Sequence, residues 1–405
     1  MCIYVLSLSV FLAVVLLLVA ALLLLEARVV QKGQRRIVIN DDPEKSIESP
    51  IGQTLLSALS ANNIYLPSAC GGKGSCALCK CRIDEGGRNI LPTELAHLSR
   101  QEKLDNVRLS CQVKVREDMK IWIPPEIFSI RKYSAAVVSN ENVATFIKEL
   151  ILKIDNNGKF DFKAGQYIQI DIPEYELSYD RISVPDIYRP AWDKFGLWEL
   201  TARAEEPVFR AYSMANTPAE ELLRFTVRIA PPPPGSDAPP GIASSYLLSL
   251  KPGDRVTFSG PYGDFLVKDT DREMCFIGGG AGMAPMRSHI FNQLLIEKTT
   301  RIMSFWYGAR SRQEMFYDEE FKELEKKFEN FTYTVALSEP LPGDNWDGPV
   351  GFIHQVAYQN YLSKHQDPTE IEYYLCGPPM MIQAVQQMLD SLGVEPDMIA
   401  YDDFG

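Results

Sequence analysis

Four unequally spaced cysteines are the residues in this sequence whose chemistry is easiest to name. Cys70, Cys76 and Cys79 fall within ten residues, and Cys111 follows thirty-two residues after Cys79. Thiolates are the soft ligands that hold [2Fe–2S] clusters, and this Cys-x5-Cys-x2-Cys run is one residue longer in its first gap than the plant-type spacing. The intervening glycines let the backbone wrap closely and point N–H groups at sulfur; they are Gly71, Gly72 and Gly74. The spacing therefore predicts an iron–sulfur cluster.

Zinc and disulfides are the competing uses of these cysteines. Zinc ribbons usually pair two short Cys-x2-Cys knuckles, and only Cys76 and Cys79 form one here. Disulfides are disfavoured because the charge pattern near the N-terminus predicts a cytoplasmic location for this segment. Cys81 lies two residues after Cys79, so we expect it to be a core residue on the same side rather than a fifth ligand.

A second set of residues has the chemistry of a flavin site. The run Arg210-Ala211-Tyr212-Ser213 offers an arginine that could grip a pyrophosphate, a tyrosine that could stack on an isoalloxazine ring and a serine that could bond a ring nitrogen. A later stretch, Gly241-Ile242-Ala243-Ser244-Ser245, adds two hydroxyl groups. On its own the first run is equally compatible with an ordinary strand, so a flavin site requires a dinucleotide-binding motif further along the chain.

A glycine-rich turn of that kind lies at a suitable distance. Residues 276–286 combine an apolar strand, a loop containing Gly279, Gly280 and Gly282, and the start of a helix, where a dinucleotide pyrophosphate binds. Pro285 takes the place of the usual third glycine and is tolerated in a first helical turn. A later strand ends in Cys376-Gly377-Pro378, which predicts that these residues lie at the ligand-binding edge of a parallel sheet. An isolated buried cysteine would instead be inert.

Composition limits the remaining possibilities. The chain has 405 residues, enough for two or three domains, with 46% hydrophobic and 23% charged residues. A net charge of −12 argues against nucleic-acid binding, which needs a basic surface. The stretch from Met1 to Leu25 carries no charge and is long enough for one transmembrane helix, whereas a signal peptide would need a basic start and a cleavage site. Positive charges follow it, which predicts that the rest of the chain is cytoplasmic.

Periodicity predicts three domains after an anchor at residues 1–26. Residues 36–125 have the pattern of a small α+β domain, with strands at 36–40, 79–83 and 111–115 and a helix at 54–62. Residues 131–265 contain short strands at 135–138, 146–154, 165–172, 198–202, 223–229 and 255–259, which suggests a small antiparallel barrel. The stretch between Ile172 and Trp198 is expected to be an irregular insertion, either a contact with a partner subunit or a solvated loop. Residues 266–405 alternate strand and helix, which predicts a doubly wound parallel sheet.

With these motifs in order, the sequence resembles known families over its whole length. Residues 36–125 are similar to [2Fe–2S] ferredoxins, and the flavin, glycine-loop and Cys-Gly-Pro-Pro motifs resemble the ferredoxin–NADP reductase superfamily. The complete arrangement resembles the family of F subunits of sodium-translocating NADH:quinone oxidoreductases, matched most closely in the runs 210–216, 278–288 and 402–405. The implied fold is a single transmembrane helix, an α+β [2Fe–2S] ferredoxin domain, an antiparallel β-barrel FAD domain and an α/β doubly wound NADH-binding domain.

The resemblance also implies a function and roles for individual residues. It implies non-covalent FAD, a [2Fe–2S] cluster, NADH as donor, and integral membrane partner subunits that reduce ubiquinone and move sodium across the cell inner membrane. Electrons are then expected to pass from NADH through FAD to the cluster. Ser213 is expected to orient the flavin, Cys376 to line the nicotinamide site, and Phe404 to cover the flavin and move aside. The residues expected to bind cofactors are Arg210, Tyr212, Ser213, Gly241, Ser244, Ser245, Gly279, Gly280, Gly282, Pro285, Cys376, Gly377 and Pro378.

Two other functions stay open from the residues alone. The reductase component of a bacterial oxygenase combines the same three modules, and a membrane-tethered zinc-binding scaffold without catalysis would explain the cysteines differently. The choice of NADH over NADPH rests on the resemblance, because no acidic residue lies in the strand at 302–307 and Arg310 could suit a 2′-phosphate.

Overall fold

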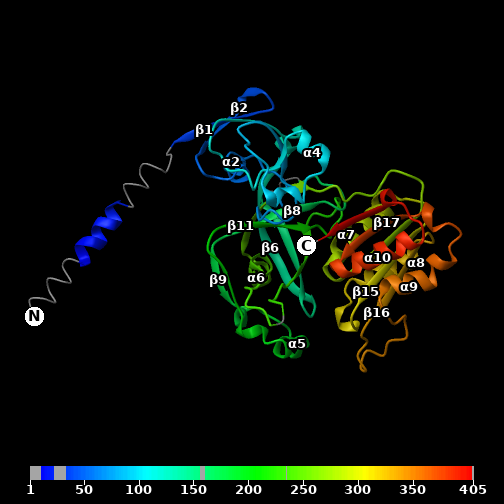
Figure 1. Ribbon diagram of the computed structural model, residues 1–405. Helices are drawn as coiled ribbons and strands as arrows, with labels where there is room; N and C mark the ends of the chain where they lie inside the picture. The colour runs from blue at the N-terminus through cyan, green and yellow to red at the C-terminus, as the bar shows by residue number, and fades with distance from the viewer. Residues whose placement is uncertain (1–10, 22–32, 156–159, 234, 404–405) are drawn as a thin grey trace, which may run out of the picture. The chain divides into compact units, whose positions relative to one another are not determined.

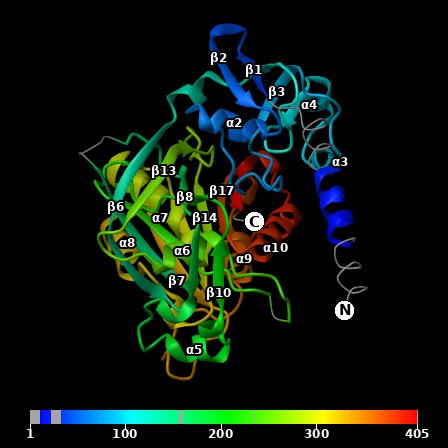
Figure 2. The same cartoon turned by 90° about the vertical axis from the view of Figure 1, so that its left-hand side faces the viewer.

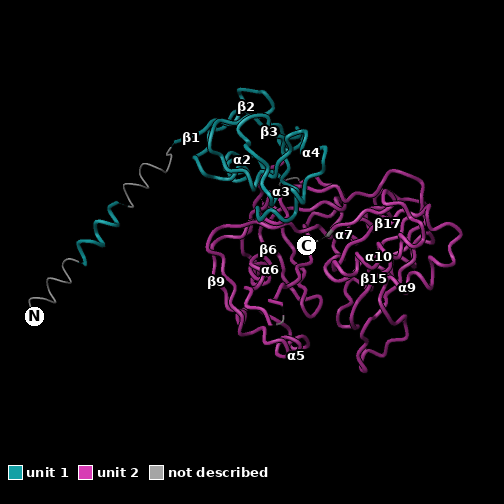
Figure 3. The backbone as a smooth tube through the Cα atoms, in the orientation of Figure 1, with its two compact units in different colours: residues 1–66, 72–129 teal, residues 67–71, 130–405 magenta. Residues whose placement is uncertain are grey.

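The computed structural model describes residues 11–21, 33–155, 160–233 and 235–403, which divide into two compact units (Figure 3). The first unit extends to Leu66 and continues from Gly72 to Ser129, and the second comprises residues 67–71 and 130–405. Residues 11–21 are helical, and among the helices within these ranges none is both long and apolar enough to cross a membrane. Most of the anchor predicted at residues 1–26, like Phe404, lies outside the described residues.

A five-stranded mixed sheet forms the first unit (Figure 1). Its strand order is β2-β1-β5-β3-β4, with β1 and β5 parallel and the other pairs antiparallel. Helix α2 (Leu55–Ala61) packs Leu55 and Leu59 into the core and begins at Thr54, whose hydroxyl accepts from the Ser57 N–H. The strands are β1 (Gln34–Ile39), β2 (Asp42–Pro50), β3 (Lys80–Glu85), β4 (Val107–Leu109) and β5 (Met119–Trp122), and two short helices are α3 (Pro92–Leu95) and α4 (Arg100–Leu104).

The strand predicted at 111–115 is wrong, whereas those at 36–40 and 79–83 and the helix at 54–62 are confirmed to within a few residues. The strand in this region, β4, ends at Leu109, and the Gln112 N–H closes a turn on the Leu109 carbonyl. The backbone of Val113 and Val115 instead bonds to the segment that leads into α2. The alternating apolar residues at 111–115 therefore belong to a loop, whose backbone hydrogen bonds do not follow the regular pattern of a β-sheet.

The first part of the second unit is a six-stranded antiparallel sheet in the order β11-β8-β13-β6-β7-β12 (Figures 1 and 2). Alternating residues of these strands, such as Leu150, Ile170 and Phe225, form one buried core with helix α6 (Ile242–Ser249). The strands are β6 (Arg131–Ala144), β7 (Ile147–Ile154), β8 (Tyr167–Ile172), β11 (Val208–Ser213), β12 (Leu223–Arg228) and β13 (Arg255–Tyr262).

The stretch between Ile172 and Trp198 contains regular structure, so the expectation of an irregular insertion is wrong. Strand β9 (Tyr175–Ser178) pairs with β10 (Thr201–Ala204), and helix α5 (Arg189–Lys194) lies between them in the chain. Trp192 is fully buried, and its indole N–H donates to the Thr145 carbonyl at 2.9 Å. The strand predicted at 198–202 starts later, at Thr201. Composition alone missed this order because buried aromatic packing stabilises it.

A five-stranded parallel sheet forms the second part of this unit, in the order β16-β15-β14-β17-β18. Helices α7 (Met283–Phe291) and α8 (Asp318–Lys327) bury Met286 and Phe321 on one face, and α9 (Ile353–Asn360) and α10 (Pro379–Ser391) bury Val356 and Val385 on the other. The predicted doubly wound sheet is confirmed. Its strands are β14 (Met274–Gly279), β15 (Met303–Ala309), β16 (Phe331–Leu337), β17 (Glu372–Gly377) and β18 (Ile399–Asp403).

Candidate cofactor sites

The end of strand β11 is bonded to the last strand of the parallel sheet. Ser213 ends β11, and its hydroxyl donates to a carboxylate oxygen of Asp402 at 2.9 Å. Asp402 lies beside Cys376 in the register of β17 and β18. The structure thus brings Ser213 and Cys376, two residues predicted to act together, to the same sheet edge. Sequence reasoning missed Asp402, and its only signal was its place in the terminal run that matched the resembled family.

The glycine loop crosses the turn after β17 at very close range. A Cβ atom added at Gly282 would lie 2.2 Å from the Cys376 carbonyl oxygen, and one at Gly377 would lie 3.1 Å from the Gly279 nitrogen. Gly282 has no room for a side chain because the obstructing atoms are backbone, and a side chain at Gly377 would crowd both the Gly279 backbone and the Met381 side chain. The loop leads directly into α7, with Pro285 in its first turn as predicted. The crossing therefore presents a helix N-terminus, which favours anions, beside Cys376.

Helix α6 offers a second helix N-terminus, at Gly241. The Ser244 hydroxyl donates to the Gly241 carbonyl at 3.2 Å, and the Ser245 hydroxyl donates to the same carbonyl at 2.6 Å. Ser245 is fully buried and also bonds the Tyr179 hydroxyl at 2.7 Å. Both serines therefore hold the turn in place. The start of α6, with its backbone N–H groups, is thus the part of this stretch that could receive an anion.

Titratable residues near these loops are held neutral. Burial raises the pKa of the Tyr212 phenol, so it stays protonated in the physiological range. Burial lowers the pKa of His289, on α7, to about 3, so this imidazole is uncharged. His289 packs among Phe265, Phe276 and Tyr374, so it is a core residue rather than a candidate acid or base. Arg310, the candidate for a 2′-phosphate, is paired with Glu339 at 2.9 Å, which offsets its charge.

Three of the four cysteines predicted to be ligands lie in the first unit: Cys76 and Cys79 follow a glycine loop with positive backbone φ angles, and Cys111 lies beside that loop. Gly72 and Gly74 have φ of 85° and 84°, values that favour glycine. A Cβ at Gly72 would lie 3.9 Å from the Cys111 Cβ, so the loop passes directly beside that cysteine. Cys79 and Cys111 are buried, Cys76 is half-buried, and the Gln112 amide lies 3.6 Å from the Cys111 sulfur as a donor. Soft thiolates beside a glycine loop with positive φ angles fit a [2Fe–2S] cluster.

The fourth cysteine, Cys70, belongs to the short segment 67–71 of the second unit. The Ser68 N–H donates to the Gln169 side chain of β8 at 2.7 Å, and a Cβ at Gly71 would lie 2.4 Å from the Phe209 carbonyl oxygen in β11. This segment therefore lies against the strand that carries Arg210. Among the described side chains no three His, Cys, Asp or Glu residues are arranged to hold a metal ion, so the ligand set of Cys70, Cys76, Cys79 and Cys111 stays a prediction.

Comparison with known proteins decides the family. Three family models match in order: the 2Fe-2S iron-sulfur cluster binding domain at residues 38–116, the oxidoreductase FAD-binding domain at 198–266 and the oxidoreductase NAD-binding domain at 276–387. The F subunit of the Na(+)-translocating NADH-quinone reductase of Mannheimia succiniciproducens is 52% identical over 404 residues, 99% of either chain. That of Klebsiella pneumoniae is 53% identical over 403 residues, again 99% of each.

The chain belongs to the family of F subunits of Na(+)-translocating NADH-quinone reductases. The prediction of FAD, a [2Fe–2S] cluster and NADH is confirmed by the three matched domains.

Among solved structures, the Amycolatopsis cytochrome P450 reductase GcoB has a TM-score of 0.63 at 23% identity, covering 91% of this chain and 98% of its own. This likeness shows the fold alone. The ferredoxin reductase in carbazole 1,9a-dioxygenase has a TM-score of 0.60 at 25% identity, covering 93% and 100%. Full-length identity of 52% to an F subunit therefore outweighs the alternative of an oxygenase reductase.

Proposed function

We propose that this chain is the NADH-oxidising subunit of a sodium-translocating NADH:quinone oxidoreductase. When bound, FAD supplies the exchange between a two-electron donor, NADH, and a one-electron acceptor, the [2Fe–2S] cluster. One observation carries the proposal: β11, the glycine loop and the turn after β17 meet at one sheet edge. The hydrogen bond from Ser213 of β11 to Asp402 of β18 joins the two sheets there. These elements lie within or beside the regions matched as FAD-binding and NAD-binding domains.

The residues of this edge have separable roles. Arg210 and the N-terminus of α6, with Gly241, Ser244 and Ser245, bind the flavin pyrophosphate, while Tyr212 and Ser213 orient the flavin ring. The loop of Gly279, Gly280 and Gly282 and the start of α7 at Pro285 bind the nicotinamide dinucleotide. Cys376, Gly377 and Pro378 line the nicotinamide site, and Phe404 covers the flavin until NADH arrives.

The proposed ligands of the cluster are Cys70, Cys76, Cys79 and Cys111. In support, the glycines between Cys70 and Cys76 have positive φ angles, a conformation in which a loop can turn its backbone N–H groups toward bound sulfur. The segment carrying Cys70 lies against β11, next to Arg210 of the flavin motif. The contact of the Cys70 segment with β11 supports transfer of electrons from the flavin to a cluster held in part by Cys70.

The finer architecture and location are also proposed. Residues 1–26 form a single anchor in the cell inner membrane, with a ferredoxin domain at 36–125, an FAD barrel at 131–265 and an NADH-binding domain at 266–405 on the cytoplasmic side. The uncharged first twenty-five residues and the positive charges that follow support this topology. The Ala215 N–H donates to the Arg224 carbonyl of β12 at 2.8 Å, which supports closure of the barrel between β11 and β12. The partners are integral membrane subunits that reduce ubiquinone and translocate sodium.

Replacement of one proposed ligand tests the separation of the two redox steps. In Cys76→Ala we expect loss of the cluster's visible spectrum and of electron transfer to an added one-electron acceptor, while NADH still bleaches the flavin. Cys81→Ala is the matched control, because Cys81 is a buried neighbour in β3 proposed to be a core residue. An unbleached flavin in Cys76→Ala would contradict the assignment of separate sites. Metal analysis that found zinc and no iron in the unmodified chain would favour the scaffold alternative instead.

A further inference from the structure

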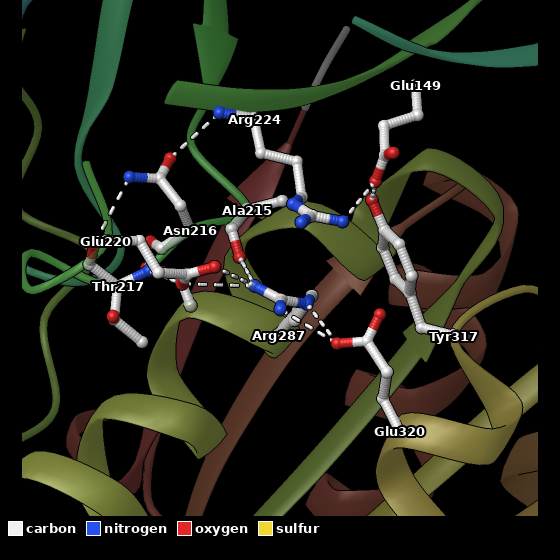
Figure 4. A network of polar contacts seen from close by, with 10 residues as sticks. Glu149, Ala215, Asn216, Thr217, Glu220, Arg224, Arg287, Tyr317 and Glu320 are labelled. Carbon is white, nitrogen blue, oxygen red and sulfur yellow. Dashed lines mark hydrogen bonds and ion pairs between the residues drawn. The ribbon is translucent and has the colours of Figure 1, made fainter. Parts of the chain in front are cut away.

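Arg287 is a buried cation at the junction between the antiparallel sheet and the parallel sheet of the second unit. It lies on α7, and only 4% of the residue is exposed. Its guanidinium donates to the Ala215 carbonyl at 2.9 Å and to Glu320 on α8 at 2.8 and 3.1 Å, and it lies 3.3 Å from Glu220 (Figure 4). One side chain thus joins three segments that are distant in the sequence.

A second ion pair lies beside the first and shares an aromatic ring with it. Arg224 of β12 pairs with Glu149 of β7 at 2.7 Å, and the Tyr317 hydroxyl donates to the same carboxylate (Figure 4). The Tyr317 ring lies under both guanidinium groups, 5.8 Å from Arg224 and 5.4 Å from Arg287. Tyr317 adopts φ of +60°, a strained angle for a residue with a side chain, and precedes α8. The surrounding contacts are what hold it there.

These contacts connect directly to the two nucleotide-binding loops. The Ser288 hydroxyl of α7 donates to the Asn216 carbonyl at 2.7 Å, and the Asn216 side chain accepts from the Arg224 N–H at 3.0 Å. Asn216 and Ala215 follow Ser213 in the segment that leaves β11. On the other side, the Thr226 hydroxyl donates to the carbonyl of Ala281, inside the glycine loop, at 2.9 Å. Both the flavin strand and the glycine loop are therefore held by the same group of contacts.

We propose that Arg287 is a positioning residue that fixes α7 and its glycine loop against the segment leaving the flavin strand, and so sets where a bound nicotinamide meets the flavin. This inference rests on the proposed function, which assigns β11 to FAD and the glycine loop to NADH. A guanidinium suits the role because its planar fork satisfies a carbonyl and two carboxylates at once. A lysine would keep the charge but could not make these bonds in fixed directions.

The test uses the full FAD-loaded chain and three variants. Arg287→Met removes the charge at similar size, and Arg287→Lys keeps the charge. Lys322→Met is the control, because Lys322 is exposed and its ion pair with Asp318 lies within α8. Hydrogen exchange of residues 283–291 and 214–220 is measured without NADH, and flavin bleaching is measured at saturating NADH. We expect faster exchange in both segments of Arg287→Met and roughly ten- to a hundredfold slower bleaching, with little change in the apparent affinity for NADH.

Arg287→Lys separates positioning from stability. A purely structural role predicts that Lys restores the melting temperature and the bleaching rate together, and this result would overturn the proposal. We expect Lys to restore the melting temperature but not the rate. If Arg287→Met does not fold, Glu320→Gln tests the proposal instead. Glu320 is partly exposed, so we expect this variant to fold, and Gln keeps a hydrogen-bond acceptor for Arg287 without the charge. Faster exchange at residues 283–291 in that variant supports the proposal, and unchanged exchange overturns it. Failure of NADH to bleach the flavin of the unmodified chain would instead contradict the proposed function. The hydrogen-exchange comparison would still show whether Arg287 holds α7 against residues 214–220.

Discussion

The first unit depends on one buried ion pair, and removing its carboxylate should unfold the cluster-binding region. The Glu94 side chain is fully buried and accepts hydrogen bonds from the Arg108 guanidinium at 2.5 and 2.9 Å. It also accepts from the backbone N–H groups of Leu91 and Leu109 at 2.9 and 3.0 Å. Leu109 ends β4, two residues before Cys111, so this carboxylate fixes the approach to a proposed ligand.

The expected magnitude follows from burial. Glu94→Ala would leave the Arg108 guanidinium, whose side chain is 5% exposed, without its carboxylate, and breaking one partner of a buried pair costs about 3–5 kcal/mol. For a unit of this size that corresponds to a drop in melting temperature of roughly 12–40 °C. The control is Glu117→Gln, because the Arg88–Glu117 pair is exposed and such pairs contribute about 0–1 kcal/mol.

The assay follows the cluster's visible absorbance and the flavin fluorescence during heating of the full chain. Glu94→Ala should lose the cluster signal at a much lower temperature than the unmodified chain, while the flavin signal moves little. The double variant Glu94→Leu with Arg108→Met should recover part of the loss, since no charge is then left unpaired. Equal shifts in Glu94→Ala and Glu117→Gln would refute the reasoning.

The same carboxylate gives the first unit a pH dependence. Burial raises the pKa of Glu94, but the bonds from Arg108, Leu91 and Leu109 outweigh it and leave the pKa below its ordinary value of 4.5. Its contribution to stability is therefore present above pH 4.5 and is lost as the pH falls through the lower folded-state pKa. Titration of the cluster absorbance toward acid should show this loss, and Glu94→Gln should flatten it.

Two further predictions concern the second unit. Gly282→Ala places a methyl group against the Cys376 carbonyl, so we expect the KM for NADH to rise by roughly tenfold or more with FAD content unchanged. Gly343→Ala is the control, because a methyl group there meets no atom within 4 Å, and we expect it to behave as the unmodified chain. Asp402→Asn keeps the shape of the Asp402 side chain but removes the charge that fixes the direction of the Ser213 hydroxyl proton. We expect slower bleaching of a normally bound flavin in stopped-flow absorbance. An unchanged rate would contradict the role of this bond.

Local chemistry made the cofactor motifs predictable from the sequence. The glycines at 279 and 282 and the cysteines in the run 70–79 indicate cofactor binding by their residue types and short spacing. The alternation of strands and helices from β14 to β17 indicates a parallel sheet. The contacts of Arg287 give no such signal. Its partners lie on two other segments, residues 215–220 and α8, that are distant from it in the chain. A single Arg or Glu in a helical stretch is by itself typical of a solvated surface.

The errors of prediction have a shared physical cause, which is tertiary packing that overrides local pattern. The alternation at 111–115 is that of a strand, but its backbone bonds are used to hold the start of α2. The stretch after Ile172 has a loop-like composition, yet Trp192 and Tyr179 are buried and their side chains bond the Thr145 carbonyl and the Ser245 hydroxyl. In both places the information lies in the contacts that the segment makes rather than in its own residues.

The bond between Ser213 and Asp402 shows how such a distant contact fixes chemistry as well as position. A serine hydroxyl has one proton to donate, and here it goes to the Asp402 carboxylate. Toward a ligand the same oxygen is left as an acceptor, which suits a ring N–H better than an unprotonated ring nitrogen. Asp402 of β18 thus selects which hydrogen bond Ser213 can offer to the proposed flavin. From the sequence alone the serine hydroxyl could donate or accept, whereas in the fold it is left to accept.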